Sequence, residues 1–126
     1  MKQKRDLVSG WMAKADSDLR TLGASLTVDA FDAACFHAQQ AAEKAMKAFL
    51  IHAGVEFPFT HNLSKLAALV AAADPEFALL ADVVEPLTPY AVELRYDADF
   101  WPDRETAEDA RSRAERVVRE ISGKLQ

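Results

Sequence analysis

The sequence feature that most constrains the fold is a run of helix-forming residues between 31 and 53, in which alanine recurs at helical spacing. With about 100° between successive residues, small and apolar side chains gather on one face of such a helix. The residues of this predicted core face are Phe31, Ala34, Cys35, Ala38, Ala41, Ala42, Ala45 and Phe49. Asp29 is placed to cap the helix and Gly54 to end it. Since alanine lets a second helix approach closely, we expect this helix to pack against others.

Helical signals also fill the rest of the chain, where β-branched residues are sparse and Gly and Pro stand at segment ends. The first predicted helix, at about 5–25, has an apolar stripe made of Leu7, Trp11, Ala15, Leu22 and Leu26. Further helices are predicted at about 60–73, at 75–97 with a break at Pro86 and Pro89, and at 104–122. The residues expected to start or stop them are Thr60 or Asn62, Asp74 with Pro75, Thr88 with Pro89, and Gly123. The predicted fold is all-α: a single domain, residues 1–126, folded as an up-and-down bundle of four main antiparallel helices plus a shorter helix.

The overall charge and the single cysteine narrow the classes of function. A formal net charge of -5 gives the whole molecule no attraction for nucleic acid or anionic membranes. No apolar run approaches the roughly 20 residues of a membrane span, and no apolar segment follows the basic N-terminal residues as a secretory signal requires. Cys35 has no second cysteine to pair with, and on the core face it is expected to be an inert thiol. Together these features predict a cytoplasmic protein.

Polar side chains on the other side of the 31–53 helix allow two interpretations. The residues that line up there are His37, Gln40, Lys44 and Lys47. They can form a solvated face, in which Glu43 and Lys47 make an i, i+4 ion pair worth about 0.3–0.5 kcal/mol. Alternatively, they form one wall of a site. Phe36 lies outside the core stripe among these polar residues, which suggests that another helix or a second subunit covers it.

Three segments together resemble the HEPN domain family, a group of small helical bundles related in fold to the helical domain of kanamycin nucleotidyltransferase. They are C-F-H-A-Q-Q-A-A-E-K-A-M-K-A-F-L in the 31–53 helix, T-H-N-L at the start of the next helix, and Y-A-V-E-L-R-Y-D further on. The resemblance extends from about Leu7 to Tyr96. It implies a homodimer with a cleft at or near the subunit interface. It also implies one of two roles: a metal-independent ribonuclease, often a toxin, or a small partner of a minimal nucleotidyltransferase that binds nucleotide or another substrate.

The ribonuclease members carry an Arg and a His in an R-x4–6-H motif, and this sequence departs from that pattern. Arg95 stands where the motif Arg would be, but Y-D-A-D-F-W-P-D follows it without a His. None of His37, His52 and His61 lies five to seven positions after an Arg. This chemistry needs an acid or base that titrates near neutral pH, and His is the usual choice. His37 or His61 can still approach Arg95 in space, so the ribonuclease interpretation stays open.

The leading hypothesis is a non-catalytic HEPN-like nucleotide- or substrate-binding module that acts with a nucleotidyltransferase partner, with a toxin–antitoxin pair as one setting. A ribonuclease toxin with a variant active site and a purely structural dimerisation module are the alternatives. With the resemblance, the predicted ligand-binding residues are His37, Gln40, Lys44, Lys47, His61, Arg95 and Tyr96. The predicted interface residues are Phe36, Phe100 and Trp101. No catalytic residue, metal site or cofactor is predicted, since the sequence has neither metal-ligand spacings nor a Gly-rich phosphate loop.

Structural roles compete with these assignments. His61 stands at a predicted helix start, where a capping-region role is the simpler interpretation. Arg95 ends a predicted helix, where a cation interacts well with the helix dipole. Phe100 and Trp101 lie in a predicted turn, where large aromatic side chains often close the end of a core.

Overall fold

The computed structural model describes residues 3–126, and this range contains helices and connecting segments without a β-strand. Its elements are α1 (Lys4–Thr27), α2 (Phe31–His52), α3 (Leu63–Ala73), the 3-10 helix η1 (Pro75–Phe77), α4 (Leu80–Val84), the 3-10 helix η2 (Glu85–Tyr90) and α5 (Arg104–Leu125). The predicted all-α bundle is confirmed, with four longer α-helices and one short one. The predicted antiparallel order is wrong for α3 and α5, because both run in the same direction as α2. No helix in the range 3–126 is both long and apolar enough to cross a membrane.

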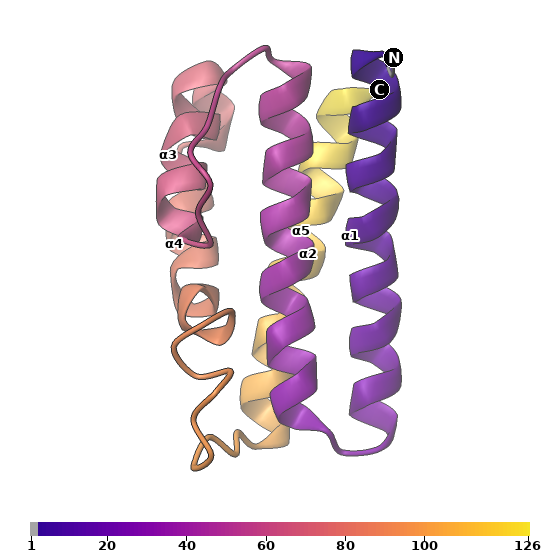
Figure 1. The fold of residues 1–126 in the computed structure, drawn as a ribbon, viewed down its shortest axis with the longest axis vertical. Coiled ribbons are helices and arrows are strands. Elements are labelled where there is room, and N and C mark those ends of the chain that lie inside the picture. The colour runs from indigo at the N-terminus through magenta and orange to yellow at the C-terminus, as the bar shows by residue number, and fades with distance from the viewer. Residues whose placement is uncertain (1–2) are drawn as a thin grey trace.

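The helices pack around α2, which contacts α1, α3 and α5 (Figure 1). A short turn joins α1 to α2, so these two helices are antiparallel. The longer segment 53–62 runs back along α2, so that α3 begins beside the middle of α2 and then runs in the same direction (Figure 1). Two contacts show this register: the His61 carbonyl lies 3.3 Å from Gln39 Nε2, and the rings of Phe77 and Phe49 are 5.1 Å apart. The start of α1 and the end of α5 lie at the same end of the bundle (Figure 1).

The central position of α2 explains its richness in alanine. The buried residues of the predicted core face are Ala34, Cys35, Ala38, Ala41, Ala42, Ala45 and Phe49, and Phe31 is half-buried. Burial extends beyond that face, to Gln39, Glu43, Met46, Lys47 and Leu50. A helix covered on several sides keeps polar groups only where partners satisfy them. The expectation of a solvated polar face is therefore wrong for Lys47, which is 6% exposed.

The apolar stripe of α1 faces the bundle, although one predicted member lies at its edge. Ala15, Leu22 and Leu26 are buried as predicted. Leu7, however, is 41% exposed, and its neighbour Val8 takes the buried position. The buried stripe of α1 follows a repeat of seven residues, which selects Val8 rather than Leu7.

Local chemistry confirms some helix ends and corrects another. Gly54 follows α2 in the left-handed conformation, with φ of 73°, as its predicted stop position requires. The Asn62 side chain accepts a hydrogen bond from a backbone N–H in the first turn of α3, so it is the cap of that helix. Asp29 is not the cap of α2, which is Ala30. Asp29 instead adopts a φ of 57°, and its carboxylate binds Arg104 at 2.5 Å.

The segment after α4 differs most from the prediction. Asp74 caps η1 as expected, but no helix resumes at Thr88, and residues 91–96 form turns. Pro86 and Pro89 lack the N–H groups that an α-helix needs, so the backbone forms the short 3-10 helix η2. The Thr88 hydroxyl is buried without a hydrogen-bond partner and therefore caps nothing. At the other end of the chain, α5 continues past Gly123 to Leu125, so the predicted stop there is wrong.

Candidate functional site

The Asp18 cluster joins α1 to α2 and consists of Asp18, His37 and Lys44. Asp18 is buried, and each of its carboxylate oxygens has a partner on α2. Oδ1 lies 2.8 Å from His37 Nδ1, and Oδ2 accepts a hydrogen bond from Lys44 Nζ at 2.7 Å. Two residues predicted to bind ligand thus hold α1 against α2.

The Glu43 cluster fixes the segment 53–62 to α2 and consists of Gln39, Gln40, Glu43, Lys47 and His61. Oε1 of Glu43 lies 2.9 Å from both Gln39 Nε2 and His61 Nδ1. Oε2 of Glu43 lies 3.0 Å from Lys47 Nζ, so the predicted Glu43–Lys47 pair is present, but buried rather than exposed. Gln40 completes the cluster by donating to Gln39 Oε1 at 2.7 Å.

Hydrogen bonding decides the charge of Glu43. Burial on its own raises the pKa of Glu43, but the hydrogen bonds from Gln39, His61 and Lys47 outweigh it and hold the pKa below its ordinary value. The carboxylate is therefore ionised at neutral pH, and His61 must be the donor in their contact. The Lys47 ammonium also lies 5.6 Å from the Phe59 ring centroid and 5.9 Å from that of Trp11. Lys47 is thus enclosed by its partners.

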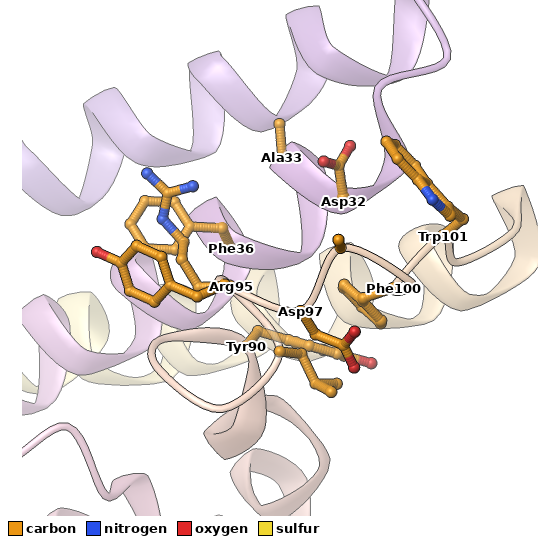
Figure 2. A pocket seen from close by; sticks show the side chains of 11 residues that line it. Asp32, Ala33, Phe36, Tyr90, Arg95, Asp97, Phe100 and Trp101 are labelled. Atoms are coloured by element: carbon orange, nitrogen blue, oxygen red, sulfur yellow. The ribbon is translucent and has the colours of Figure 1, made fainter.

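A separate hollow, the α2–turn pocket, lies between the first half of α2 and the segment 90–101 (Figure 2). Its volume is about 280 Å³. The lining residues are Asp32, Ala33, Phe36, Tyr90, Leu94, Arg95, Tyr96, Asp97, Ala98, Phe100 and Trp101. Figure 2 shows Arg95 and Trp101 on opposite sides of the pocket, with Asp32 between them. The pocket therefore combines aromatic walls with charges of both signs.

Aromatic rings position the walls of the α2–turn pocket. The guanidinium carbon of Arg95 lies 4.2 Å from the centroid of the Phe36 ring, a cation–π contact. On the floor, the Tyr90 and Phe100 rings stack with their centroids 5.6 Å apart. The Trp101 side chain is different, because 76% of its surface is exposed. A large apolar ring this exposed is available to a ligand or to another chain.

The charges of the α2–turn pocket are not paired with one another. Among residues 3–126, neither Asp32 nor Arg95 forms an ion pair or a side-chain hydrogen bond. Asp97 is exposed, and its carboxylate accepts a hydrogen bond from the backbone N–H of Asp99 at 2.9 Å. These charges differ from those of the Asp18 and Glu43 clusters, where each carboxylate has partners.

Two groups near the pocket floor have raised pKa values. Burial raises the pKa of the Cys35 thiol to about 11, although the neighbouring Tyr90 hydroxyl acts in the opposite direction. Burial, together with Cys35, raises the pKa of Tyr90 to about 12. Both groups therefore keep their protons at neutral pH, and neither supplies a nucleophilic anion. Within residues 3–126, no three His, Cys, Asp or Glu side chains gather as a metal site.

The structure distributes the predicted site residues over separate places. Arg95 and Tyr96 line the α2–turn pocket together with the predicted interface residues Phe36, Phe100 and Trp101. The other predicted ligand-binding residues, which are His37, Gln40, Lys44, Lys47 and His61, are not among its lining residues. His37 is its neighbour, because the His37 ring packs edge-on against Phe36 with centroids 5.2 Å apart.

Asp18, Asp32 and Glu43 were not predicted as site residues. Asp32 lies one helical turn before Phe36, so the helical repeat places both on the same side of α2. Glu43 carries one local signal, its i, i+4 spacing to Lys47, whereas no local signal sets Asp18 apart from the other acidic residues. The partners that join them to other helices or segments, His37 and Lys44 for Asp18 and His61 for Glu43, are 18 to 26 positions away in the sequence.

Comparison with known proteins points to one family. The model of the HEPN domain family matches residues 8–124. Among solved structures, the chain is similar to ST0689, an archaeal HEPN homologue, with 23% sequence identity, a TM-score of 0.79 and complete coverage of both chains. It is also similar to TT1696 from Thermus thermophilus, with 29% identity, a TM-score of 0.75 and coverage of 98% of this chain and 99% of that one. No curated protein matches the chain.

Proposed function

The chain belongs to the HEPN domain family, and from that premise we propose that it is a non-catalytic binding module whose ligand site is the α2–turn pocket. In this proposal Arg95 and Tyr96 contact a nucleotide or a related substrate. The module is a homodimer in the cytoplasm and works with a nucleotidyltransferase partner, in the setting of a toxin–antitoxin pair.

The observation that carries the proposal is the environment of Arg95. No His follows Arg95 at the spacing of the R-x4–6-H motif, and its guanidinium rests on the Phe36 ring. The nearest acid–base candidates in the pocket are the carboxylates of Asp32 and Asp97, which repel the phosphates of RNA. Cys35 and Tyr90 are protonated at neutral pH. A pocket with a cation and aromatic rings but no histidine among its lining residues suits binding better than hydrolysis.

The remaining predicted ligand-binding residues have a supporting role in this proposal. His37 and Lys44 in the Asp18 cluster, and Lys47 and His61 in the Glu43 cluster, keep α1 and the segment 53–62 rigid against α2. A rigid α2 fixes Phe36, which in turn positions Arg95.

The test is a pull-down of the protein from its source cell at native expression, followed by mass spectrometry of proteins and analysis of bound nucleotides. Recovery of a nucleotidyltransferase supports the proposed partnership. The control is the double variant Arg95→Ala with Trp101→Ala, expressed at the same level. Loss of the partner or the nucleotide from its pull-down shows that capture depends on the pocket. Recovery of neither a protein partner nor a nucleotide contradicts the proposal.

A ribonuclease with a variant site is the second candidate, because His37 and Arg95 contact the same Phe36 ring. That arrangement brings a His and an Arg near each other without the motif spacing. If it is catalytic, overexpression arrests growth and purified protein cleaves RNA, and both effects vanish in His37→Ala and in Arg95→Ala. Intact RNA at high protein concentration excludes this candidate.

The homodimer is proposed to use the face that carries Phe36, Phe100 and Trp101. The observation that favours this face is that two large exposed rings, Trp101 and Tyr96, line the same pocket there. In this case Phe36→Asp gives monomers in sedimentation analysis, whereas Phe59→Asp, a change at the 91%-exposed ring of the segment 53–62, leaves the dimer unchanged. A dimer that survives Phe36→Asp places the interface elsewhere.

A further inference from the structure

The unpaired charges of the α2–turn pocket indicate which part of a nucleotide it can hold. Asp32 is half-buried on α2, yet no side chain or backbone N–H among residues 3–126 donates a hydrogen bond to its carboxylate. On the other side of the pocket, Arg95 offers its guanidinium N–H groups, also without a partner in that range (Figure 2). The pocket thus presents one strong acceptor and one strong donor to whatever enters it.

The net charge of the lining argues against a phosphate in the pocket. Asp32 and Asp97 carry two negative charges against the single positive charge of Arg95. A phosphate that entered the pocket would meet these two carboxylates as well as Arg95, and their repulsion would oppose its attraction to Arg95. A simple cation would be repelled by the positive charge of Arg95. A neutral group with both donors and acceptors fits this lining best.

The size and the walls of the pocket favour a single planar ring system. A volume of about 280 Å³ is at or below the lower limit of about 300 Å³ for sites that hold drug-sized ligands. The exposed Trp101 ring and the 83%-exposed Tyr96 ring offer faces for stacking. Stacking on aromatic side chains is how proteins hold unpaired bases, and it tolerates many sequences because each base has a π face.

We propose that the α2–turn pocket binds the base of a nucleoside and leaves the phosphates outside in solvent. Asp32 accepts hydrogen bonds from an exocyclic amino group, and Arg95 donates to a ring nitrogen or carbonyl oxygen of the same base. Trp101 stacks on the base. The ligand class is therefore an amino-bearing base, which is guanine, adenine or cytosine, in preference to uracil. This inference rests on the proposed function, and it assigns to Arg95 contact with the base instead of the phosphate.

The experiment is a titration of the purified full chain, followed by isothermal calorimetry and by tryptophan fluorescence. The probes are guanosine, adenosine, cytidine and uridine, their triphosphates, and inorganic tripolyphosphate. The chain has two tryptophans, so Trp11→Phe isolates the Trp101 signal and Trp101→Phe removes it. We expect at least one amino-bearing nucleoside to quench Trp101 and to bind within a few fold of its triphosphate, while tripolyphosphate does not compete.

Asp32→Asn is the decisive variant because it keeps the shape of the side chain and replaces one acceptor oxygen with a donor. The expected result is a loss of at least about tenfold in affinity for the amino-bearing nucleoside, with little change for uridine. Asp82→Asn, at an exposed position of α4 away from the pocket, is the matched control and leaves all affinities unchanged. Unfolding curves of both variants confirm that they fold.

The contrary results separate this inference from the proposed function. If triphosphates bind, tripolyphosphate competes and Asp32→Asn has no effect, the pocket recognises phosphate; the inference is then wrong and the binding function stands. If methylguanidinium binds and nucleosides do not, the pocket takes a basic side chain of a protein partner, which also overturns the inference. If no nucleoside, nucleotide or polyphosphate binds, nucleotide binding itself is wrong.

Discussion

The Glu43 cluster and the α2–turn pocket both lie along α2, and they use charge in opposite ways. In the Glu43 cluster a buried carboxylate has donors on both oxygens, and the Lys47 side chain is 7% exposed. In the α2–turn pocket Asp32 and Arg95 line a hollow and have no ion-pair or side-chain hydrogen-bond partner among residues 3–126. The same residue types thus stabilise the fold in one place and remain available to a ligand in the other. Pairing, more than residue type, distinguishes the structural charges from the functional candidates.

The largest expected loss of stability comes from breaking the ion pair in the Glu43 cluster. Lys47→Met leaves the buried Glu43 carboxylate without its cation. Removal of one member of a buried ion pair costs about 3–5 kcal/mol, and we expect a loss of that size here. Urea denaturation measures this loss in the free energy of unfolding. The matched control is Arg95→Met in the pocket, where the exposed cation–π contact is worth only about 0.5–1 kcal/mol. Equal losses in the two variants would contradict the distinction.

A second experiment uses pH to remove the Glu43 charge. Since the pKa of Glu43 is lower in the folded state than its ordinary value of 4.5, the unfolded chain binds the proton more readily. The stability that the charge contributes is fully present above pH 4.5 and is lost as the pH falls through the folded pKa. Glu43→Gln should cost about 1.5–3 kcal/mol at neutral pH, the worth of hydrogen bonds to a charged group. Its deficit relative to the wild-type chain should shrink in acid; a deficit independent of pH would contradict this account.

The Asp18 cluster tests the comparison at intermediate burial. Asp18→Asn keeps the size of the side chain but removes its charge and turns one acceptor into a donor facing Lys44. We expect a loss of about 1–2 kcal/mol in the free energy of unfolding, below that of Lys47→Met because Lys44 and His37 are partly exposed and can turn to water. Asp16→Asn, at an exposed site on the same helix, is the control. If Asp18→Asn lowers the free energy of unfolding no more than Asp16→Asn does, the Asp18 cluster contributes no more to stability than a surface charge.

The smallest expected effect on stability is that of Trp101→Ala. Since 76% of Trp101 is exposed, its loss should change the free energy of unfolding by less than about 0.5 kcal/mol. Phe49→Ala, a buried ring of α2, should cost about 3–5 kcal/mol. Thermal and urea unfolding measure both variants. A large loss for Trp101→Ala would mean that this ring closes the core and is not held available.

The sequence was sufficient to predict the helices that follow local rules. The alanine face of α2, the Gly54 stop and the Asn62 cap depend on residues within one or two helical turns of each other. The structure after Pro86 was harder to predict. The same pattern of polar and apolar residues fits an α-helix, but the chain forms a 3-10 helix and a series of turns there.

The site was less predictable, because its contacts join distant parts of the chain. Helical geometry placed Lys47 opposite the core face, but there its ammonium pairs with Glu43 and lies near the rings of Trp11 and Phe59, two residues distant in sequence. The contact between Arg95 and Phe36 depends on how the segment 90–101 folds back against α2. The spacing of residues in the sequence does not predict that path. Asp32 becomes a candidate binding residue only once the structure shows that its carboxylate has no ion-pair or hydrogen-bond partner among residues 3–126.

The path of the segment 53–62 has a consequence for the order in which the chain folds. The α1–α2 hairpin needs only a short turn and can form early, since closing a short loop costs little chain entropy. Because α3 runs parallel to α2, it is expected to dock only after the segment 53–62 has packed along α2 and His61 contacts Gln39. The Arg104 side chain contacts Asp29 and the Leu26 carbonyl, which closes separations of 75 and 78 residues. The α2–turn pocket, formed by the segment just before α5, is therefore expected to be among the last regions of the molecule to take shape.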